Sequence, residues 1–241
     1  MSRFHLLSYR QNATTLAHAG VRLWRYADPR HRKSTSVILL CRYGRYAPSI
    51  ARLSLHAKEQ KWVRDFSKPQ QRDWIMGRWL AHQALFLLNG IKSAQCWIGR
   101  NKYGAPQVHG MLTRRTRISI SHVDGWVGVV IHRFKEVGLD IEYGTELTLA
   151  SARYFLSTKE IAQLTSTAGF PLNAWIAKEA AYKAWCCGDS EQLRNIHLSM
   201  VHQGVANKQN FVAGRHSSNA RLNVSYQHFQ NLNLHMGLAF L

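Results

Sequence analysis

Apolar and polar residues alternate in two stretches near the middle of the chain, residues 117–132 and 135–144. Such alternation predicts β-strands with one buried face. Asp124-Gly125 divides the first stretch and favours a tight turn, so residues 119–130 are expected to form a hairpin. The tail, residues 196–241, alternates in a similar way and is interpreted as further strands.

Apolar residues spaced three and four apart, and the residues that flank such segments, indicate the helices. Residues 71–88 carry apolar side chains at helical spacing and end at Asn89-Gly90, which predicts a buried helix. Ser157 and Glu160 have the spacing of a capping box and should begin a second helix. A third is expected over residues 172–185, between Pro171 and Gly188.

The remaining segments are less regular. Residues 21–50 mix basic residues with strand-forming ones and are interrupted at Asp28-Pro29 and Pro48, which indicates strands and turns. Residues 99–110 are expected to form a loop. Helices packed on antiparallel sheets define an α+β protein.

Composition supports a globular protein of one domain or two small ones. The 241 residues are 46% hydrophobic and 19% charged. We expect a cytoplasmic protein with no membrane segment, because the N-terminus lacks the apolar stretch of a signal peptide and no apolar run is long enough to span a bilayer. The four cysteines, Cys41, Cys96, Cys186 and Cys187, lack metal-ligand spacing and are interpreted as reduced thiols.

Positive charge is concentrated in one half of the chain. Residues 1–136 contain 24 Lys and Arg against 6 Asp and Glu, a net +18, whereas residues 137–241 contain 8 against 7, a net +1. A basic surface attracts anionic partners, which include nucleic acid, anionic membranes, acidic proteins and phosphorylated small molecules. Charge by itself does not choose among them.

Asp140 and Glu142 are the first candidates for chemistry. Alternation with Val137, Leu139 and Ile141 places both carboxylates on one face of a strand, about 7 Å apart, and the aliphatic residues on the face that enters the core. Oxygen ligands so close suit a hard cation such as Mg²⁺. A strand face that simply meets water is the alternative.

Glu179 and Lys183 are the second candidates. They are four residues apart in an alanine- and tryptophan-rich helix, and therefore share one helical face. On a largely buried helix such a pair needs partners, which a metal ion and a phosphate would supply. The alternative is an ordinary surface ion pair.

Two further segments contain possible phosphate ligands. Ser121 and His122, at a strand end, could both donate hydrogen bonds to anionic oxygen, although a histidine beside a turn is more often structural. Arg100 and Lys102 precede Gly104-Ala105-Pro106 in a shaped loop from which both cations could reach a phosphate.

Taken in order, these segments resemble the 4′-phosphopantetheinyl transferase superfamily in its monomeric two-domain, surfactin-synthetase-activating form. The family shows Gly-Lys-Pro, Ser-x-Ser-His, Gly-[Ile/Val]-Asp-[Ile/Val]-Glu and Trp-x-x-Lys-Glu-[Ala/Ser]-x-x-Lys. The corresponding segments here are residues 104–106, 119–122, 138–142 and 175–183, and residues 153–160 resemble the family's intervening segment. The likeness is close over residues 100–183.

The resemblance implies two similar α+β halves related by a pseudo-twofold, residues 1–136 and 137–241, with the active site in the cleft between them. The enzyme would transfer phosphopantetheine from coenzyme A to a serine of an acidic acyl or peptidyl carrier protein. It would act as a monomer and bind neither nucleic acid nor membrane.

The resemblance also implies a role for each candidate residue. Asp140, Glu142 and Glu179 would hold Mg²⁺, or Mn²⁺, against the pyrophosphate, and Lys183 would offset charge on the phosphate being cleaved. Glu179 is the expected general base. The nucleotide end of coenzyme A would be held by Arg72, Arg100, Lys102, Ser121 and His122.

The chain departs from the family pattern at Ala105, where the family has lysine, and at Val123, where a small hydroxyl residue is usual. Two alternatives stay open, and Ala105 supports only the first. One is an inactive relative that binds carrier proteins, and the other is a nucleic-acid-binding protein that uses the basic half and its interleaved aromatic residues.

Overall fold

The computed structural model describes residues 21–26, 36–43, 48–110, 115–144, 146–185, 193–203, 207–215 and 218–240. The chain forms two compact units, Met1–Lys135 and Glu136–Leu241. Both combine helices with antiparallel sheets, so the α+β prediction is confirmed. Asp28-Pro29, Cys186, Cys187 and Gly188 lie outside the described residues.

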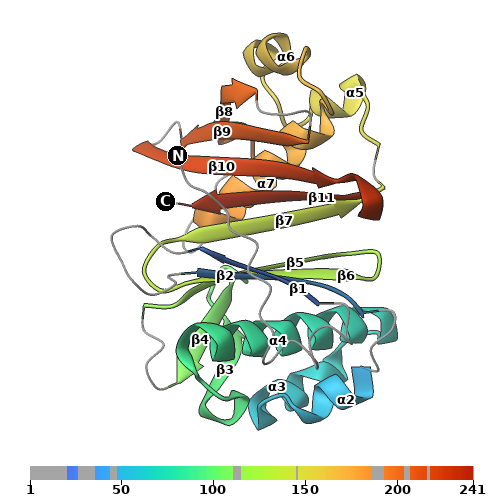
Figure 1. Ribbon diagram of the computed structural model, residues 1–241, viewed down its shortest axis with the longest axis vertical. Coiled ribbons are helices and arrows are strands. Elements are labelled where there is room, and N and C mark those ends of the chain that lie inside the picture. Colours follow the sequence, from blue (N-terminus) through green and yellow to red (C-terminus); the bar gives the residue numbers. More distant parts are fainter. Residues whose placement is uncertain are drawn as a thin grey trace. The chain divides into compact units, whose positions relative to one another are not determined.

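The N-terminal unit contains a four-stranded antiparallel sheet in the order β1-β2-β6-β5 and a separate hairpin, β3–β4. Helix α4 packs against β2, β5 and β6 (Figure 1). The elements are β1 (Val21–Tyr26), β2 (Ser36–Arg42), α2 (Pro48–Leu53), α3 (Ala57–Trp62), α4 (Lys68–Asn89), β3 (Cys96–Arg100), β4 (Pro106–Gly110), β5 (Arg117–Val123) and β6 (Trp126–His132).

Local sequence explains most of these boundaries. The hairpin at Asp124-Gly125 is confirmed, and both residues have positive φ, 36° and 78°, as a type I′ turn requires. Helix α4 is confirmed as a buried helix that ends at Gly90, whose φ is 70°. It begins three residues before the predicted start because Ser67 and Gln70 form a capping box.

The predicted loop over residues 99–110 is wrong. Strand β3 continues to Arg100 and β4 begins at Pro106, so only Asn101–Ala105 connect them. The turn is tight because the Asn101 side chain accepts hydrogen bonds from the backbone N–H groups of Tyr103 and Ala105, and Gly104 has a φ of 85°.

The C-terminal unit is a five-stranded antiparallel sheet in the order β7-β11-β10-β9-β8. Helix α7 packs on β7, β10 and β11 (Figure 1). The elements are β7 (Val137–Tyr143), α5 (Leu149–Ala152), α6 (Thr158–Leu164), α7 (Leu172–Trp185), β8 (Ile196–Gln203), β9 (Lys208–Arg215), β10 (Ser218–Phe229) and β11 (Leu234–Phe240). The predicted helix over 172–185, the capping box of α6 and the strands of the tail are confirmed. No helix among the described residues is long and apolar enough to cross a membrane.

A buried ion pair anchors α7 within this unit. Lys178 is fully buried, and its Nζ lies 2.9 Å from Oε1 of Glu160 and donates a hydrogen bond to the carbonyl oxygen of Phe155. Glu160 also accepts hydrogen bonds from the backbone N–H groups of Ser157 and Leu198. One carboxylate therefore ties together α6, α7 and β8.

The pKa of Glu160 reflects this environment. Burial acts to raise it, but the hydrogen bond from Ser157 and the charge of Lys178 outweigh burial, so the pKa lies below its ordinary value. A carboxyl with a depressed folded-state pKa stabilises the protein above its unfolded-state pKa, and that contribution is lost as pH falls through the folded-state value.

We predict that Glu160→Gln lowers the free energy of unfolding at pH 7 by about 3 kcal/mol or more, because it leaves the Lys178 ammonium buried without its counter-charge. Chemical denaturation measures the change. The difference in free energy of unfolding between the unchanged chain and Glu160→Gln should shrink as pH falls below about 4.3, the ordinary pKa of a glutamate. Glu146→Gln, at an exposed carboxylate of the same unit, is the control and should stay within about 0.5 kcal/mol.

Candidate active site

Strand β7 turns its polar face toward helix α7. Gly138, which shares that face with Asp140 and Glu142, lies so close to the helix that a Cβ atom would overlap the carbonyl oxygen of Ala180 and lie 2.6 Å from the Ala184 nitrogen. Asp140 and Glu142 therefore lie on the strand face that meets α7, and not on a face that simply meets water. The aliphatic Val137, Leu139 and Ile141 are buried, as expected.

A second glycine allows the same approach on the neighbouring strand. Gly237 of β11 is paired with Asp140, and a Cβ atom there would lie 2.7 Å from the Ile176 carbonyl oxygen. Because both strands lack a side chain beneath α7, the helix backbone packs directly on the sheet. This contact distance allows side chains of α7 to reach the carboxylates of β7.

The structure brings Asp140, Glu142, Glu179 and Lys183 together. Lys183 Nζ lies 2.5 Å from Asp140 Oδ1, and the indole Nε1 of Trp175 donates to Glu142 Oε1 at 3.4 Å. Burial raises the pKa of Glu179, and the charge of Asp140 raises it further, while Lys183 opposes the shift and Glu142 adds to it. The alternative of an ordinary surface ion pair between Glu179 and Lys183 is thus not what the structure shows, because Lys183 pairs with Asp140 in a four-residue cluster.

This donor set fits a hard divalent cation in its chemistry. Three carboxylates repel one another around a single ammonium group, and Mg²⁺ is bound through such oxygens. Within the described residues, however, no group of three or more His, Cys, Asp or Glu side chains already has the arrangement of a metal site. The ligand role of Asp140, Glu142 and Glu179 therefore stays a prediction.

The sequence analysis did not predict that His235 lies near this cluster. It lies opposite Glu142 in the β7–β11 pair, its Nδ1 is 2.7 Å from the hydroxyl of Tyr226, and its ring stacks on His228 with the centroids 4.0 Å apart. Burial, and then His228, lower the pKa of His235 to about 4, so the ring is neutral at pH 7. The residues around His235 carry no sequence signal of this position, because the contact with β7 depends on strand register.

The N-terminal unit gathers part of the predicted nucleotide site. Arg100, Gly104, Pro106 and His122 line one cavity of about 320 Å³. His122 Nδ1 lies 3.6 Å from Oδ2 of Asp73, on α4. The cavity thus combines two predicted phosphate ligands with a carboxylate that orients the imidazole.

Other predicted ligands are placed differently. Ser121 is buried and, as the neighbour of His122 in a strand, directs its side chain to the opposite face. Arg72 is exposed on α4, and Lys102 is exposed with its Nζ 4.7 Å from the ring centroid of Tyr103. None of these three lines the cavity, and their roles stay predictions.

Sequence reasoning missed the contribution of α4 to this cavity. Gln70, Asp73 and Gly77 lie three and four residues apart and line it together with Arg78. Tyr43 donates a hydrogen bond to Asp73. The available signal was a strip of polar and small residues along a helix that is otherwise apolar.

Comparison with known proteins agrees with the cluster on β7 and α7. Residues 136–237 match the sequence profile of the 4′-phosphopantetheinyl transferase superfamily (ACPS). No curated protein matches the chain. Residues 136–237 are therefore similar to this superfamily, and the matched segment contains Asp140, Glu142, Glu179 and Lys183.

We predict that Gly138→Ala lowers the free energy of unfolding by about 3 kcal/mol or more, because the added methyl group forces α7 away from β7. Gly214→Ala is the matched control, since a Cβ atom on this β9 glycine meets nothing within 4 Å. Chemical denaturation compares the two variants. Equal stability of the two would contradict direct backbone packing of α7 on β7.

Proposed function

We propose that this protein transfers the 4′-phosphopantetheine group of coenzyme A to a serine of an apo acyl or peptidyl carrier protein. The products are holo carrier protein and adenosine 3′,5′-bisphosphate. The observation that carries the proposal is the cluster of Asp140, Glu142, Glu179 and Lys183 inside the segment that is similar to the transferase superfamily. The particular two-domain, surfactin-synthetase-activating type is part of the proposal.

The reaction replaces the phosphoanhydride bond of coenzyme A by a phosphodiester bond to the carrier serine. The serine oxygen forms a bond to the β-phosphorus of coenzyme A, the pyrophosphate bond breaks, and adenosine 3′,5′-bisphosphate leaves. Such transfers depend mainly on positioning and on neutralising charge. Bound Mg²⁺, or Mn²⁺, supplies part of that neutralisation.

Each residue of the cluster has a part in this step. Asp140, Glu142 and Glu179 would hold the cation. Glu179 accepts the serine proton, and its raised pKa favours this role because a general base works best when its pKa approaches the working pH. Lys183, already paired with a carboxylate of the site, is placed to offset negative charge on the leaving phosphate.

The N-terminal unit is proposed to bind the nucleotide end of coenzyme A. Arg100 and His122 supply the contacts to phosphate in the 320 Å³ cavity. Arg72, Lys102 and Ser121 do not line that cavity, and their part in binding the nucleotide rests on the resemblance alone. Ala105 removes the lysine of the family pattern, and the exposed Lys102 is the nearest substitute in sequence. The +18 charge of residues 1–136 would attract acidic carrier proteins.

One repeated feature supports the two similar halves that the resemblance implies. Glu59 is the third residue of α3 in a capping box, accepts a hydrogen bond from the backbone N–H of Ile98 in β3, and pairs with His82 of α4. Glu160 makes the corresponding contacts to β8 and α7 in its own unit. The monomeric state and the cytoplasmic location belong to the same proposal.

An assay of carrier-protein mass tests this function. The purified chain, coenzyme A, Mg²⁺ and apo carrier proteins of fatty-acid, polyketide and nonribosomal-peptide type should give a carrier heavier by one phosphopantetheine group. Activity should disappear with a chelator and return with Mg²⁺. No mass change with any carrier would contradict the transferase proposal and leave the inactive relative as the explanation.

We predict that Glu179→Gln and Asp140→Ala each lower kcat/KM by at least about 100-fold, because each removes a carboxylate that would hold the cation and Glu179→Gln also removes the proposed base. Glu146→Gln, which removes an exposed carboxylate outside the cluster, should leave the rate within about twofold. Undiminished activity in Glu179→Gln would refute the assignment of the base.

A further inference from the structure

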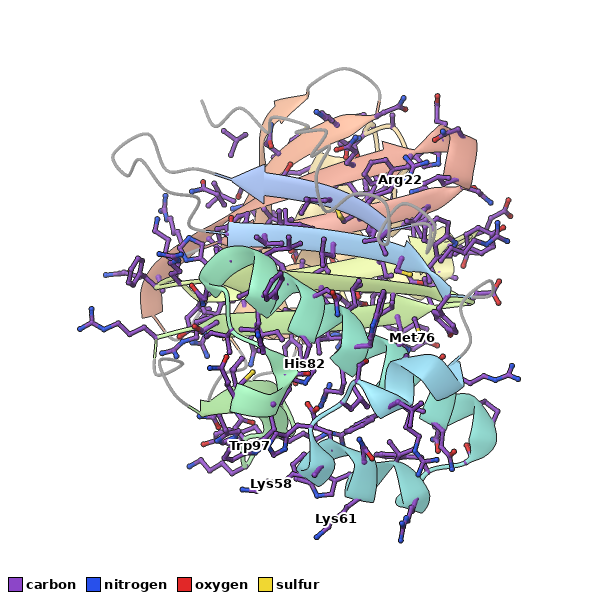
Figure 2. All side chains as sticks on the ribbon, turned by 60° about the horizontal axis from the view of Figure 1, so that its bottom comes forward. Arg22, Lys58, Lys61, Met76, His82 and Trp97 are labelled. Atoms are coloured by element: carbon purple, nitrogen blue, oxygen red, sulfur yellow. The ribbon has the colours of Figure 1, made fainter. Side chains whose placement is uncertain are left out.

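A second cavity of the N-terminal unit, of about 470 Å³, is lined by residues of α4, β3 and β4, together with Trp62 at the end of α3. This volume is in the range of small-molecule sites in proteins. Figure 2 shows Trp97 of β3 near Lys58 and Lys61 of α3 at this end of the unit. Of the residues that line this cavity, only Arg100 has a role in the function proposed above.

Aromatic rings form most of the cavity wall. Trp97 stacks on His109 with the centroids 5.2 Å apart and the ring planes 8° from parallel, and the Lys58 ammonium lies 3.7 Å from the Trp97 centroid. Trp62 meets Trp74 edge to face at 6.4 Å. The contacts with His109 and Lys58 thus hold Trp97 in place, and rings fixed in this way provide apolar surface for a planar ligand.

Gly99 keeps space open between two of these rings. A Cβ atom on Gly99 would lie 2.9 Å from Nε2 of His109 and 3.8 Å from the Trp62 ring. Gly99 has an ordinary strand backbone without positive φ, so its conformation does not require glycine. The missing side chain instead widens the cavity.

Two arginines supply the charge. Arg78 is 6% exposed, its Nε donates to the carbonyl oxygen of Ile98, and its guanidinium lies 4.8 Å from the centroid of Trp74. Arg100 lies over Phe66 at 5.9 Å. Within the described part of the chain, neither guanidinium forms a salt bridge.

The position of these cations favours an anionic ligand. Burial lowers the pKa of Arg78 to about 10, Glu59 opposes this, and the charge of Arg100 lowers it further. A buried cation beside a second cation, with no carboxylate paired to either, is stabilised when an anion binds both. A bare phosphate would leave the tryptophan surfaces unused, and an uncharged ring would leave the guanidinium groups without an anion.

We propose that this cavity binds a planar aromatic anion, with its ring against Trp62 and Trp97 and its carboxylate or phosphate at Arg78 and Arg100. The cavity lies within the N-terminal unit, and of the residues assigned to the proposed function it contains only Arg100. Two sources share the chemistry. One is an independent aromatic acid, for which the proposal does not depend on the transferase activity, and the other is the adenine nucleotide of coenzyme A, for which it rests on the proposed function.

Calorimetric titration of the full chain tests the proposal with two probes, indole-3-acetate and adenosine 3′,5′-bisphosphate. At least one should bind with a Kd below about 1 mM. Trp62→Ala and Gly99→Ala, which change only residues of this cavity and not of the 320 Å³ one, should each weaken binding by about tenfold or more. Circular dichroism checks that both variants fold.

Lys61→Gln is the matched control. Lys61 is exposed, next to Trp62 in the chain, and does not line the cavity, so its loss removes one positive charge from the same region. Binding to this variant should change by less than about twofold. Displacement of indole-3-acetate by adenosine 3′,5′-bisphosphate would identify the nucleotide as the source, and simultaneous binding would identify an independent acid.

Two results would overturn the proposal. One is the absence of measurable binding of either probe to the folded wild-type chain. The other is an equal loss of affinity in Trp62→Ala, Gly99→Ala and Lys61→Gln, because general attraction to a basic surface would then account for the binding. Neither outcome depends on a measurement of transferase activity, so the failure of this proposal and the failure of the proposed function are distinguishable.

Discussion

The ion pair between Lys178 and Glu160 is the interaction on which the C-terminal unit depends. Lys178 is fully buried and Glu160 almost so, and ions taken out of water are tolerated only when nearly every polar atom has a partner. Here the ammonium reaches two backbone carbonyl groups as well as the carboxylate, and the carboxylate accepts N–H groups from α6 and β8. The pair therefore holds α7 at one position on the sheet, and Glu179, the next residue, is placed with it.

The close packing of α7 on the sheet brings the residues of the candidate active site together. The two glycines beneath the helix, Gly138 and Gly237, let its backbone contact β7 and β11 directly. Lys183 can then pair with Asp140, and Glu179 comes under the influence of the β7 carboxylates. The chemistry proposed for the protein thus rests on two residues that have no side chain and on a buried lysine that has no proposed chemical role.

The N-terminal unit uses a related anchor for a different purpose. Glu59 joins α3, α4 and β3 as Glu160 joins α6, α7 and β8, although its partner on the long helix is His82 instead of a lysine. This anchor holds the β3–β4 hairpin beside α4, and Arg78 and Arg100 consequently face two adjoining cavities. Arginine side chains thus line the cavities of one unit, while the other unit gathers carboxylates.

The sequence by itself determined the elements whose signals are local. The Asp124-Gly125 hairpin, the Ser157–Glu160 capping box, α7 and the alternating tail were all predictable, because turns, caps and periodicity involve residues near one another in the chain. The order of the motifs also indicated the transferase superfamily, which the match to residues 136–237 supports. Only the tertiary structure decided that the polar face of β7 meets α7, that Lys183 pairs with Asp140, that His235 lies beside Glu142, and that Ser121 and His122 diverge. Each of these depends on strand register or on the approach of a helix to a sheet, and such contacts join residues whose separation in the chain carries no periodic signal.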